Sequence, residues 1–395
     1  MKSKSNFLVL VALVFSVYCC SSRGDISVYE IIVDGNIVHT ASLNGLKSDT
    51  VSIAISSFVE YCILVQLETK EGAFVVPSTP TITDRYIGIK QFHNNEPYKL
   101  FDRSGKFLQN IGSFGGGPGE YQVFIWDDVI DDENELIYLT PLMTDKILVY
   151  NTSGQFVKEI VAPRLMTTPS MILSDNILSV VHMTFNDETF AIQFDVRTGE
   201  ILSELVNLTI NSLNQDVAIY STRNVPNILD FFSIAKDMLY HFDFKNNTIL
   251  PVFTTEYSFP DIVKLYYQLN KDIIITHLVH FSKDYSRHQE MGLVATDLKH
   301  KTSSFIRVVN DYFGNIPVPI SEIGDFLESN LRNGYLAYSI QPEELMEVIK
   351  NRLTERGIIE SDRQILTKAL STLKEGANNV VFIGKLKSEV KTKLW

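Results

Sequence analysis

The chain has 395 residues and carries 47 acidic against 35 basic side chains, a formal net charge of −12 at pH 7. Nucleic-acid binding depends on Lys and Arg to neutralise phosphates, so this balance excludes a nucleic-acid partner. The chain has three cysteines, and Cys19 and Cys20 adjoin the end of an apolar leader. Cys62 is then left without an internal disulfide partner, and the fold must depend on packing.

Residues 1–19 have the features of a secretion signal. Lys2 and Lys4 precede an apolar run over residues 7–18, which is too short for the ~20 residues that span a bilayer. The run ends in Val-Tyr-Cys-Cys-Ser-Ser, which is similar to a bacterial lipobox and predicts Cys20 as a lipidated residue. The alternative is an ordinary signal peptide with incidental cysteines. Removing residues 1–19 leaves 33 basic against 47 acidic side chains, a net charge of −14.

Residues 20–50 are polar with scattered apolar residues, and we expect a tether followed by an irregular N-terminal segment. Residues 51–395 are expected to form a single domain. Within it, residues 59–68 read VEYCILVQLE, a run that predicts a strand.

Hairpin-like segments recur along the domain at a nearly constant spacing. Leu-Phe-Asp-Arg-Ser-Gly-Lys-Phe at 100–107 matches Val-Tyr-Asn-Thr-Ser-Gly-Gln-Phe at 149–156, and weaker copies follow. The markers of the five copies, which lie 44 to 54 residues apart, are Phe101, Tyr150, Phe194, Phe242 and Thr296. A repeat of about 40–50 residues with four short strands is typical of propeller blades.

The loop GSFGGGPGEY at 112–121 precedes the clearest copy of the repeat. Glycine and proline prevent strand packing there and give the loop a set shape. This loop, the Phe-Asp-x-x-Gly-Lys-Phe hairpin and the closing segment NNVVFIGKLK at 378–387 resemble the NHL-like six-bladed β-propeller lipoproteins of Bacteroides-type bacteria. The resemblance runs from about residue 51 to the C-terminus. It implies an all-β fold and a place in the cell envelope.

The last blade is expected to close the ring. An open ring would leave unpaired strand edges, so we predict that residues 59–68 pair with 380–386 and join three C-terminal strands. A stretch of helical period at about 342–376 interrupts this blade, with Pro342 suited to a first helical position. The prediction is a six-bladed β-propeller with a small helical insertion.

Five residues are candidates for a ligand-facing surface, because binding sites of propellers form where loops from several blades converge at the channel. Glu120 and Tyr121 end the glycine-rich loop, where they either hold the loop in place or contact a ligand. Trp126 and Asp128 lie where the next inner strand begins. His182 lies on another blade, at a depth similar to that of His241, and the two are candidates to meet near the axis.

No sequence motif of a catalytic, cofactor or metal site is present, so we expect none of these. The first hypothesis is therefore a non-catalytic binding or scaffold module for a peptide, a glycan or an envelope protein. A lipid would hold it to the cell envelope, at the outer membrane on the periplasmic or the surface side. The alternative is a hydrolase, lactonase or lyase centred on a metal in the channel, since one scaffold carries many chemistries.

Overall fold

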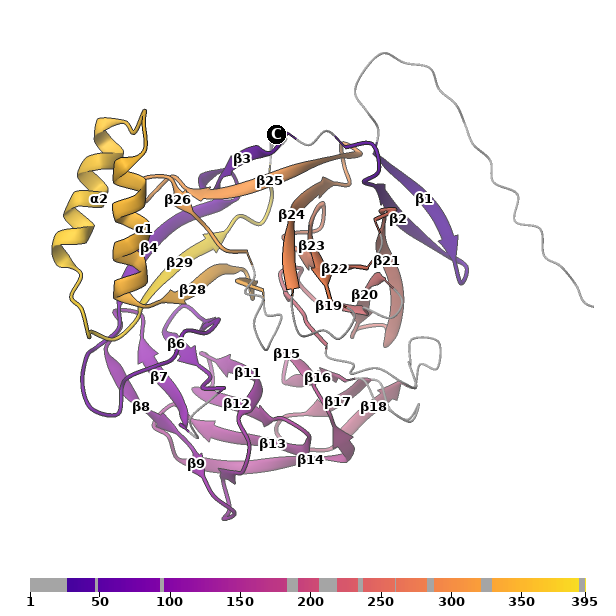
Figure 1. Ribbon diagram of the computed structural model, residues 1–395. Coiled ribbons are helices and arrows are strands. Elements are labelled where there is room, and N and C mark those ends of the chain that lie inside the picture. The colour runs from indigo at the N-terminus through magenta and orange to yellow at the C-terminus, as the bar shows by residue number, and fades with distance from the viewer. Residues whose placement is uncertain are drawn as a thin grey trace, which may run out of the picture.

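Six small sheets surround one axis in the computed structural model (Figure 1). The structure describes residues 27–46, 49–92, 96–182, 191–205, 219–233, 237–259, 261–282, 288–320, 329–390 and 395. The fold is the predicted six-bladed β-propeller, and the two helices that it contains within these residues lie outside the ring.

The first three blades follow the chain, each with its innermost strand first and its outermost strand last. Blade 1 is β5 (Thr81–Ile82), β6 (Tyr86–Ile89), β7 (Tyr98–Asp102) and β8 (Phe107–Ile111). Blade 2 is β11 (Ile125–Asp131), β12 (Leu136–Pro141), β13 (Thr144–Asn151) and β14 (Phe156–Met166). Blade 3 is β15 (Ser170–Ser174), β16 (Ile177–Val181), β17 (Ala191–Asp195) and β18 (Ile201–Leu205). Between the first two lie the paired β9 (Ser113–Phe114) and β10 (Glu120–Tyr121).

The last three blades also use strands from the N-terminal part of the chain. Blade 4 contains β19 (Ile228–Ser233), β20 (Met238–Asp243) and β21 (Thr248–Glu256). Blade 5 contains β22 (Ile262–Gln268), β23 (Ile273–Phe281), β24 (His288–Asp297), β25 (Thr302–Asn310) and β26 (Ile316–Pro317). Blade 6 contains β27 (Leu331–Arg332), β28 (Tyr335–Ile340), β29 (Val380–Leu386) and β4 (Val59–Gln66).

The repeated hairpin forms for the same local reasons in blades 1 and 2. Asp102 Oδ1 accepts hydrogen bonds from the amides of Ser104 and Lys106, at 2.8 and 3.1 Å. Asn151 Oδ1 makes the equivalent contacts in blade 2. A glycine follows in each turn with positive φ, 87° at Gly105 and 81° at Gly154. A short polar side chain and a glycine thus set the turn, and the apolar residues around it enter the core.

The predicted ring closure is confirmed. β4 pairs with β29 in antiparallel register, with Gln66 opposite Val380 and Val59 opposite Leu386. Blade 6 therefore combines one N-terminal strand with three C-terminal strands, and the pairing covers the edge that β29 would otherwise expose.

The expectation of an irregular segment before residue 51 is wrong for its described part. β1 (Val28–Val33) and β2 (Asn36–Ser42) form a hairpin, and β2 lies parallel to β21 at the edge of blade 4. β3 (Val51–Ala54) adds to the edge of blade 5 beside β25 and is followed by the short helix η1 (Ile55–Ser57). The hairpin signal is Asp34-Gly35, both with positive φ, between apolar runs. The polar composition of residues 20–50 obscured this signal.

The helical insertion lies between β28 and β29. It consists of α1 (Pro342–Thr354), with Pro342 at its first turn, and α2 (Glu360–Thr372). The helices pack on the loop before β26, where the Arg352 Nε donates to the Gly314 carbonyl at 3.0 Å and Asn315 donates to Asp362 at 2.8 Å. Neither helix is long and apolar enough to cross a membrane, and the same holds for the rest of the described chain.

Candidate functional site

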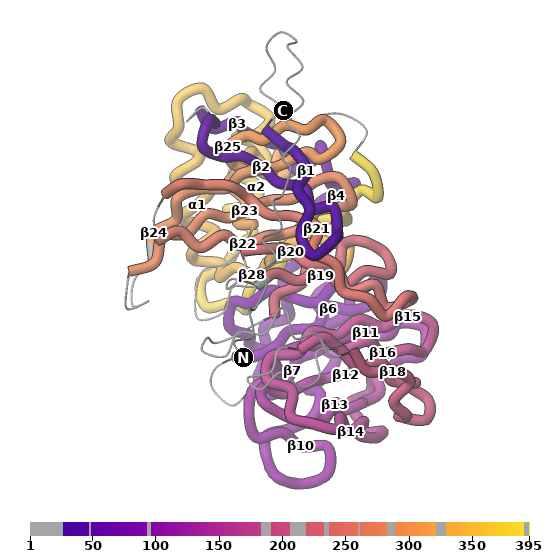
Figure 2. Tube along the Cα trace, turned by 90° about the vertical axis from the view of Figure 1, so that its right-hand side faces the viewer, coloured from indigo at the N-terminus to yellow at the C-terminus, as the bar shows by residue number. Residues whose placement is uncertain are grey.

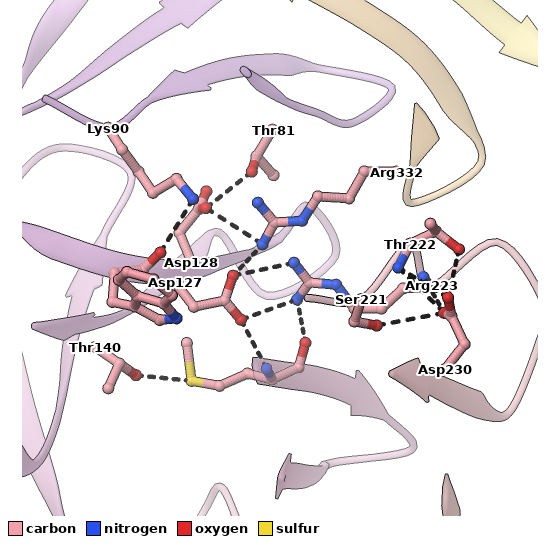
Figure 3. Close-up of polar contacts among 12 residues, drawn as sticks. Thr81, Lys90, Asp127, Asp128, Thr140, Ser221, Thr222, Arg223, Asp230 and Arg332 are labelled. Atoms are coloured by element: carbon pink, nitrogen blue, oxygen red, sulfur yellow. Dashed lines mark hydrogen bonds and ion pairs between the residues drawn. The ribbon is translucent and has the colours of Figure 1, made fainter. Parts of the chain in front are cut away.

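A cluster of four charged side chains occupies the axis of the ring. We call Asp127, Asp128, Arg223 and Arg332 the axial charge cluster (Figure 3). All are buried, with exposed fractions between 0 and 8%. They come from the inner strands of blades 2 and 6 and from the residue segment that leads into blade 4, so the cluster joins parts of the ring that are far apart in the sequence.

The carboxylate of Asp127 is the centre of the cluster. Arg223 donates from Nη1 to Oδ2 at 3.2 Å and from Nη2 to Oδ1 at 3.1 Å, a bidentate pair. Arg332 donates from Nη2 to Oδ1, and the backbone amide of Met171 donates to Oδ2 at 2.7 Å. Both oxygens of Asp127 are thus engaged by donors from blades 3, 4 and 6.

The carboxylate of Asp128 is held by a different set of groups. Thr81 donates its hydroxyl hydrogen to Oδ1 at 2.9 Å, and Tyr98 donates to Oδ2 at 2.7 Å. Arg332 Nη2 lies 3.8 Å from Oδ1, so this arginine lies between the two neighbouring carboxylates. A register shift between Ile125 and Asp127 in the β11–β12 pairing accompanies this arrangement at the start of β11.

Two Arg-Asn segments position the arginines. Arg223-Asn224 precedes β19, and Arg332-Asn333 starts at the last residue of β27. The segments bind each other, because the Asn333 amide donates to the Thr222 carbonyl at 2.8 Å and the Gly334 amide donates to Asn224 Oδ1 at 2.8 Å. Arg223 has a φ of 53° and Asn333 a φ of 54°, a conformation that is costly for residues other than glycine. The surrounding hydrogen bonds hold both residues in it.

The neighbouring carboxylates favour the protonated forms of Arg332 and Tyr98. Burial alone would lower the pKa of Arg332, but Asp127 and Asp128 outweigh burial and raise it. Burial, together with the neighbouring Asp128 carboxylate, raises the pKa of Tyr98 well above its usual value. Tyr98 is therefore a neutral hydrogen-bond donor to Asp128, and Arg332 keeps its proton.

A second buried carboxylate, Asp230, lies beside the cluster on β19. It accepts from the backbone amides of Thr222 and Arg223 and from the Thr222 hydroxyl, the latter at 2.7 Å. Burial raises the pKa of Asp230 and lowers the pKa of His241, its partner across the β19–β20 ladder. His241 Nε2 forms a 2.7 Å hydrogen bond with Gln268 Oε1, which links blades 4 and 5.

The cluster separates two cavities. The narrow pocket has a volume of about 30 Å³, room for one or two waters, and its lining includes Trp126, Asp127, Tyr220, Ser329 and Arg332. The wide pocket has a volume of about 360 Å³. Residues near the start of the innermost strands, such as Trp126 of β11 and Ser170 of β15, line the narrow pocket. Residues further along the same strands, such as Ile130 and Leu173, line the wide pocket, so the two pockets lie at opposite ends of the axis. The wide pocket is lined by Thr81, Ile82, Thr83, Asp84, Val129, Ile130, Met171, Ile172, Leu173, Arg223, Asn333 and Tyr335.

Three of the five ligand-facing candidates lie in the inner part of the blades. Trp126 lines the narrow pocket beside Asp127, and Asp128 is fully buried within the axial charge cluster. His182 is fully buried just after β16. His241, a candidate to meet His182 near the axis, forms a hydrogen bond with Gln268. The structure thus brings Trp126 and Asp128 to the axis.

The other two candidates, Glu120 and Tyr121, form β10 on the periphery of the ring (Figures 1 and 2). Glu120 Oε2 accepts from the Gly117 amide at 2.7 Å and so ties the loop to its own backbone. Tyr121 is 3% exposed, and its hydroxyl accepts from the Tyr98 amide at 2.9 Å and donates to the Ile111 carbonyl at 3.1 Å. These contacts hold the loop to its own backbone and to blade 1, which is the loop-holding role considered from the sequence.

This loop leads to a stability prediction for two of its glycines. Gly119 has a φ of 72°, and a Cβ atom there would lie 2.5 Å from the Phe156 ring. We expect Gly119→Ala to lower the free energy of unfolding by roughly 1–3 kcal/mol. Gly116→Ala is the matched control, because its Cβ would meet only the amide of Gln122 at 3.3 Å and its φ is not positive. Urea unfolding of both variants checks this, and equal stability would contradict it.

Within the described ranges, no group of three or more His, Cys, Asp or Glu side chains is close enough to hold a metal ion. Cys20, the predicted lipidation site, lies outside the described residues. Cys62 is half-buried and packs against the hydrophobic core, and burial raises the pKa of its thiol to about 11, which disfavours the nucleophilic thiolate.

Sequence reasoning missed Asp127 as the centre of the cluster, together with both arginines. One signal was available: Arg-Asn occurs at 223–224, before β19, and again at 332–333, where Arg332 ends the innermost strand β27. A charged residue in or beside an apolar inner strand indicates a buried polar contact, because buried charges need partners.

Comparisons with known proteins support the fold and the family. The structure is similar to that of a protein from Bacteroides fragilis NCTC 9343 described as exported, with a TM-score of 0.59 and 16% identity over 88% of this chain and 99% of that chain. A member of the DUF4221 family from Bacteroides vulgatus gives a TM-score of 0.46 and 10% identity over 82% of this chain and 96% of that one. No curated protein matches the chain. The family model described as "Domain of unknown function (DUF4934)" matches residues 38–385, so this chain, a β-propeller, belongs to that family.

Proposed function

We propose that this protein is exported, held to the cell envelope by a lipid on Cys20, and acts as a non-catalytic binding module. The observation that carries the proposal is the wide pocket, whose volume of about 360 Å³ lies within the range of small-ligand sites. Residues from blades 1, 2, 3 and 6 and Arg223 line it, so the closed ring holds its shape.

The lining favours a peptide segment as the ligand. Six of the twelve lining residues are apolar, and the other six are polar; the apolar ones are Ile82, Val129, Ile130, Met171, Ile172 and Leu173. The apolar part of this wall would stabilise an apolar side chain of a peptide, because burying that side chain removes it from water. The exposed Asp84 and the side chain of Asn333 offer an acceptor and a donor to a peptide backbone. The Tyr335 hydroxyl donates to Asp84 Oδ1 at 2.9 Å and orients this carboxylate.

The channel carboxylates favour binding over metal-dependent catalysis. Asp127, Asp128 and Asp230 each accept hydrogen bonds on both oxygens from side chains or backbone amides. A metal ion or a substrate proton at these oxygens would have to displace donors that hold several blades together.

The test selects peptides from a random display library on the protein from residue 21 onward. We expect enrichment of sequences with one aliphatic anchor, and a Leu173→Trp variant, which fills the wide pocket, should bind them at least about tenfold more weakly. Leu202→Trp is the matched control, because Leu202 is exposed on the outermost strand of the same blade. Equal binding to both variants would contradict the pocket. Stoichiometric calcium or zinc in protein purified without chelators, with turnover of an ester or lactone, would favour the enzyme alternative.

A further inference from the structure

The hairpin of β1 and β2 ends in an exposed apolar pair. Ile32 and Ile37 are directly opposite each other in the antiparallel register and so lie on the same face. Their exposed fractions, 69% and 60%, are the two highest of any large apolar side chain in the described residues. β2 pairs with β21 only from His39 to Ser42, so the tip extends past the edge of the blade 4 sheet.

Natural edge strands usually carry charges that discourage contacts, and this hairpin carries few. Its one carboxylate on the isoleucine face, Glu30, lies 3.9 Å from His39 Nδ1 and 3.8 Å from Lys301 Nζ. The turn contributes Asp34, which lies beyond the apolar pair in the chain. The tip therefore presents an apolar face with a polar end, a pattern suited to the boundary between lipid headgroups and acyl chains.

The position of the hairpin in the chain indicates what covers this face. Eight residue steps separate Cys20 from Val28, a reach of at most about 28 Å. The four steps from Val28 to Ile32 along β1 span only about 13 Å. A lipid on Cys20 would thus keep the hairpin within reach of the membrane, and the tether is long enough for the tip to touch it.

We propose that the tip of the β1–β2 hairpin, with Ile32 and Ile37, docks on the surface of the lipid bilayer. This inference rests on the lipid anchor of the proposed function. The hairpin lies at the periphery of the ring in Figure 1, so docking there leaves both ends of the axis open to water and the wide pocket accessible. Because Asp34 and the net charge of −14 repel anionic headgroups, the bilayer it fits is zwitterionic.

The experiment measures flotation of Cys20→Ser protein, which carries no lipid, with phosphatidylcholine vesicles. We expect weak binding that an Ile32→Ser/Ile37→Ser double variant reduces by roughly tenfold and that added anionic lipid also reduces at low salt. Ile359→Ser is the matched control, since Ile359 is 59% exposed but precedes α2 in the helical insertion. Circular dichroism checks that the double variant folds.

Two further measurements separate this proposal from the lipid anchor. Mass spectrometry of the membrane fraction shows whether Cys20 carries a lipid, and hydrogen exchange of the lipidated protein in vesicles reports on the amides of residues 28–38.

Slowed exchange at the tip supports docking. A lipidated Cys20 with unchanged exchange and no flotation overturns the hairpin proposal alone. An unmodified Cys20 with retained flotation contradicts the anchor and leaves the hairpin. Protection that requires an added protein overturns membrane docking.

Discussion

Asp127→Ala is expected to lower the free energy of unfolding by about 3–5 kcal/mol, the usual cost of removing one partner of a buried ion pair. The substitution leaves Arg223 and Arg332 buried without their shared carboxylate, and it removes the acceptor of the Met171 amide. Since the whole stability of a protein is usually 5–15 kcal/mol, the variant should be close to its unfolding threshold at 37 °C. Urea or thermal unfolding of the purified protein measures the effect.

Two controls show whether the effect belongs to the cluster. Glu159→Gln removes an exposed carboxylate that pairs with Lys146 at 2.9 Å on blade 2, and we expect almost no change. Replacing Asp127, Arg223 and Arg332 together by apolar residues of similar size should recover much of the loss, because no unpaired charge then remains. If Asp127→Ala unfolds at the same urea concentration as the parent, the cluster does not hold the blades together.

A chain that begins at residue 67 is expected not to fold. It lacks β4, so β29 keeps β28 but loses its outer partner strand, and it also lacks η1 and the residues around it. Phe58, Val59 and Val65, each 0–7% exposed, leave the core. At about 1.5–3 kcal/mol for each buried apolar side chain, these losses are comparable to the total stability. Size-exclusion chromatography and the cooperativity of urea unfolding report the result.

Two matched chains test whether ring closure is the cause. A chain that begins at residue 49 keeps β3, η1 and β4, and we expect it to unfold cooperatively although the β1–β2 hairpin is gone. Moving residues 56–66 to the C-terminus by a short Gly/Ser linker after residue 390 should restore the chain that begins at 67. The register permits this, because Val59 lies opposite Leu386 and the Lys387 amide donates to the Phe58 carbonyl at 2.8 Å. Failure of the moved strand to rescue folding would contradict the closure argument.

The sequence by itself determined the blades, since their signals are local. Asp102 and Asn151 with their following glycines set the hairpin turns, and alternating apolar runs between them select strands. Closure of the ring was also predictable, because β29 would have an unpaired edge unless the apolar strand at 59–66 paired with it. The helical insertion was predictable because its signals, helical periodicity and Pro342 at the first turn, are also local.

Only the tertiary structure decided which residues meet on the axis. Asp127 and Arg332 are 205 positions apart, and Asp127 and Arg223 are 96 apart. Such contacts depend on how all six sheets are placed around the ring. Local sequence patterns do not predict this placement. The N-terminal hairpin shows the same limit: Asp34-Gly35 indicates a turn, but its pairing with blade 4 follows from the free edge of β21. Local periodicity determines which segments form strands and helices. Which of these elements lie side by side is determined by the need to pair buried charges and to cover free strand edges.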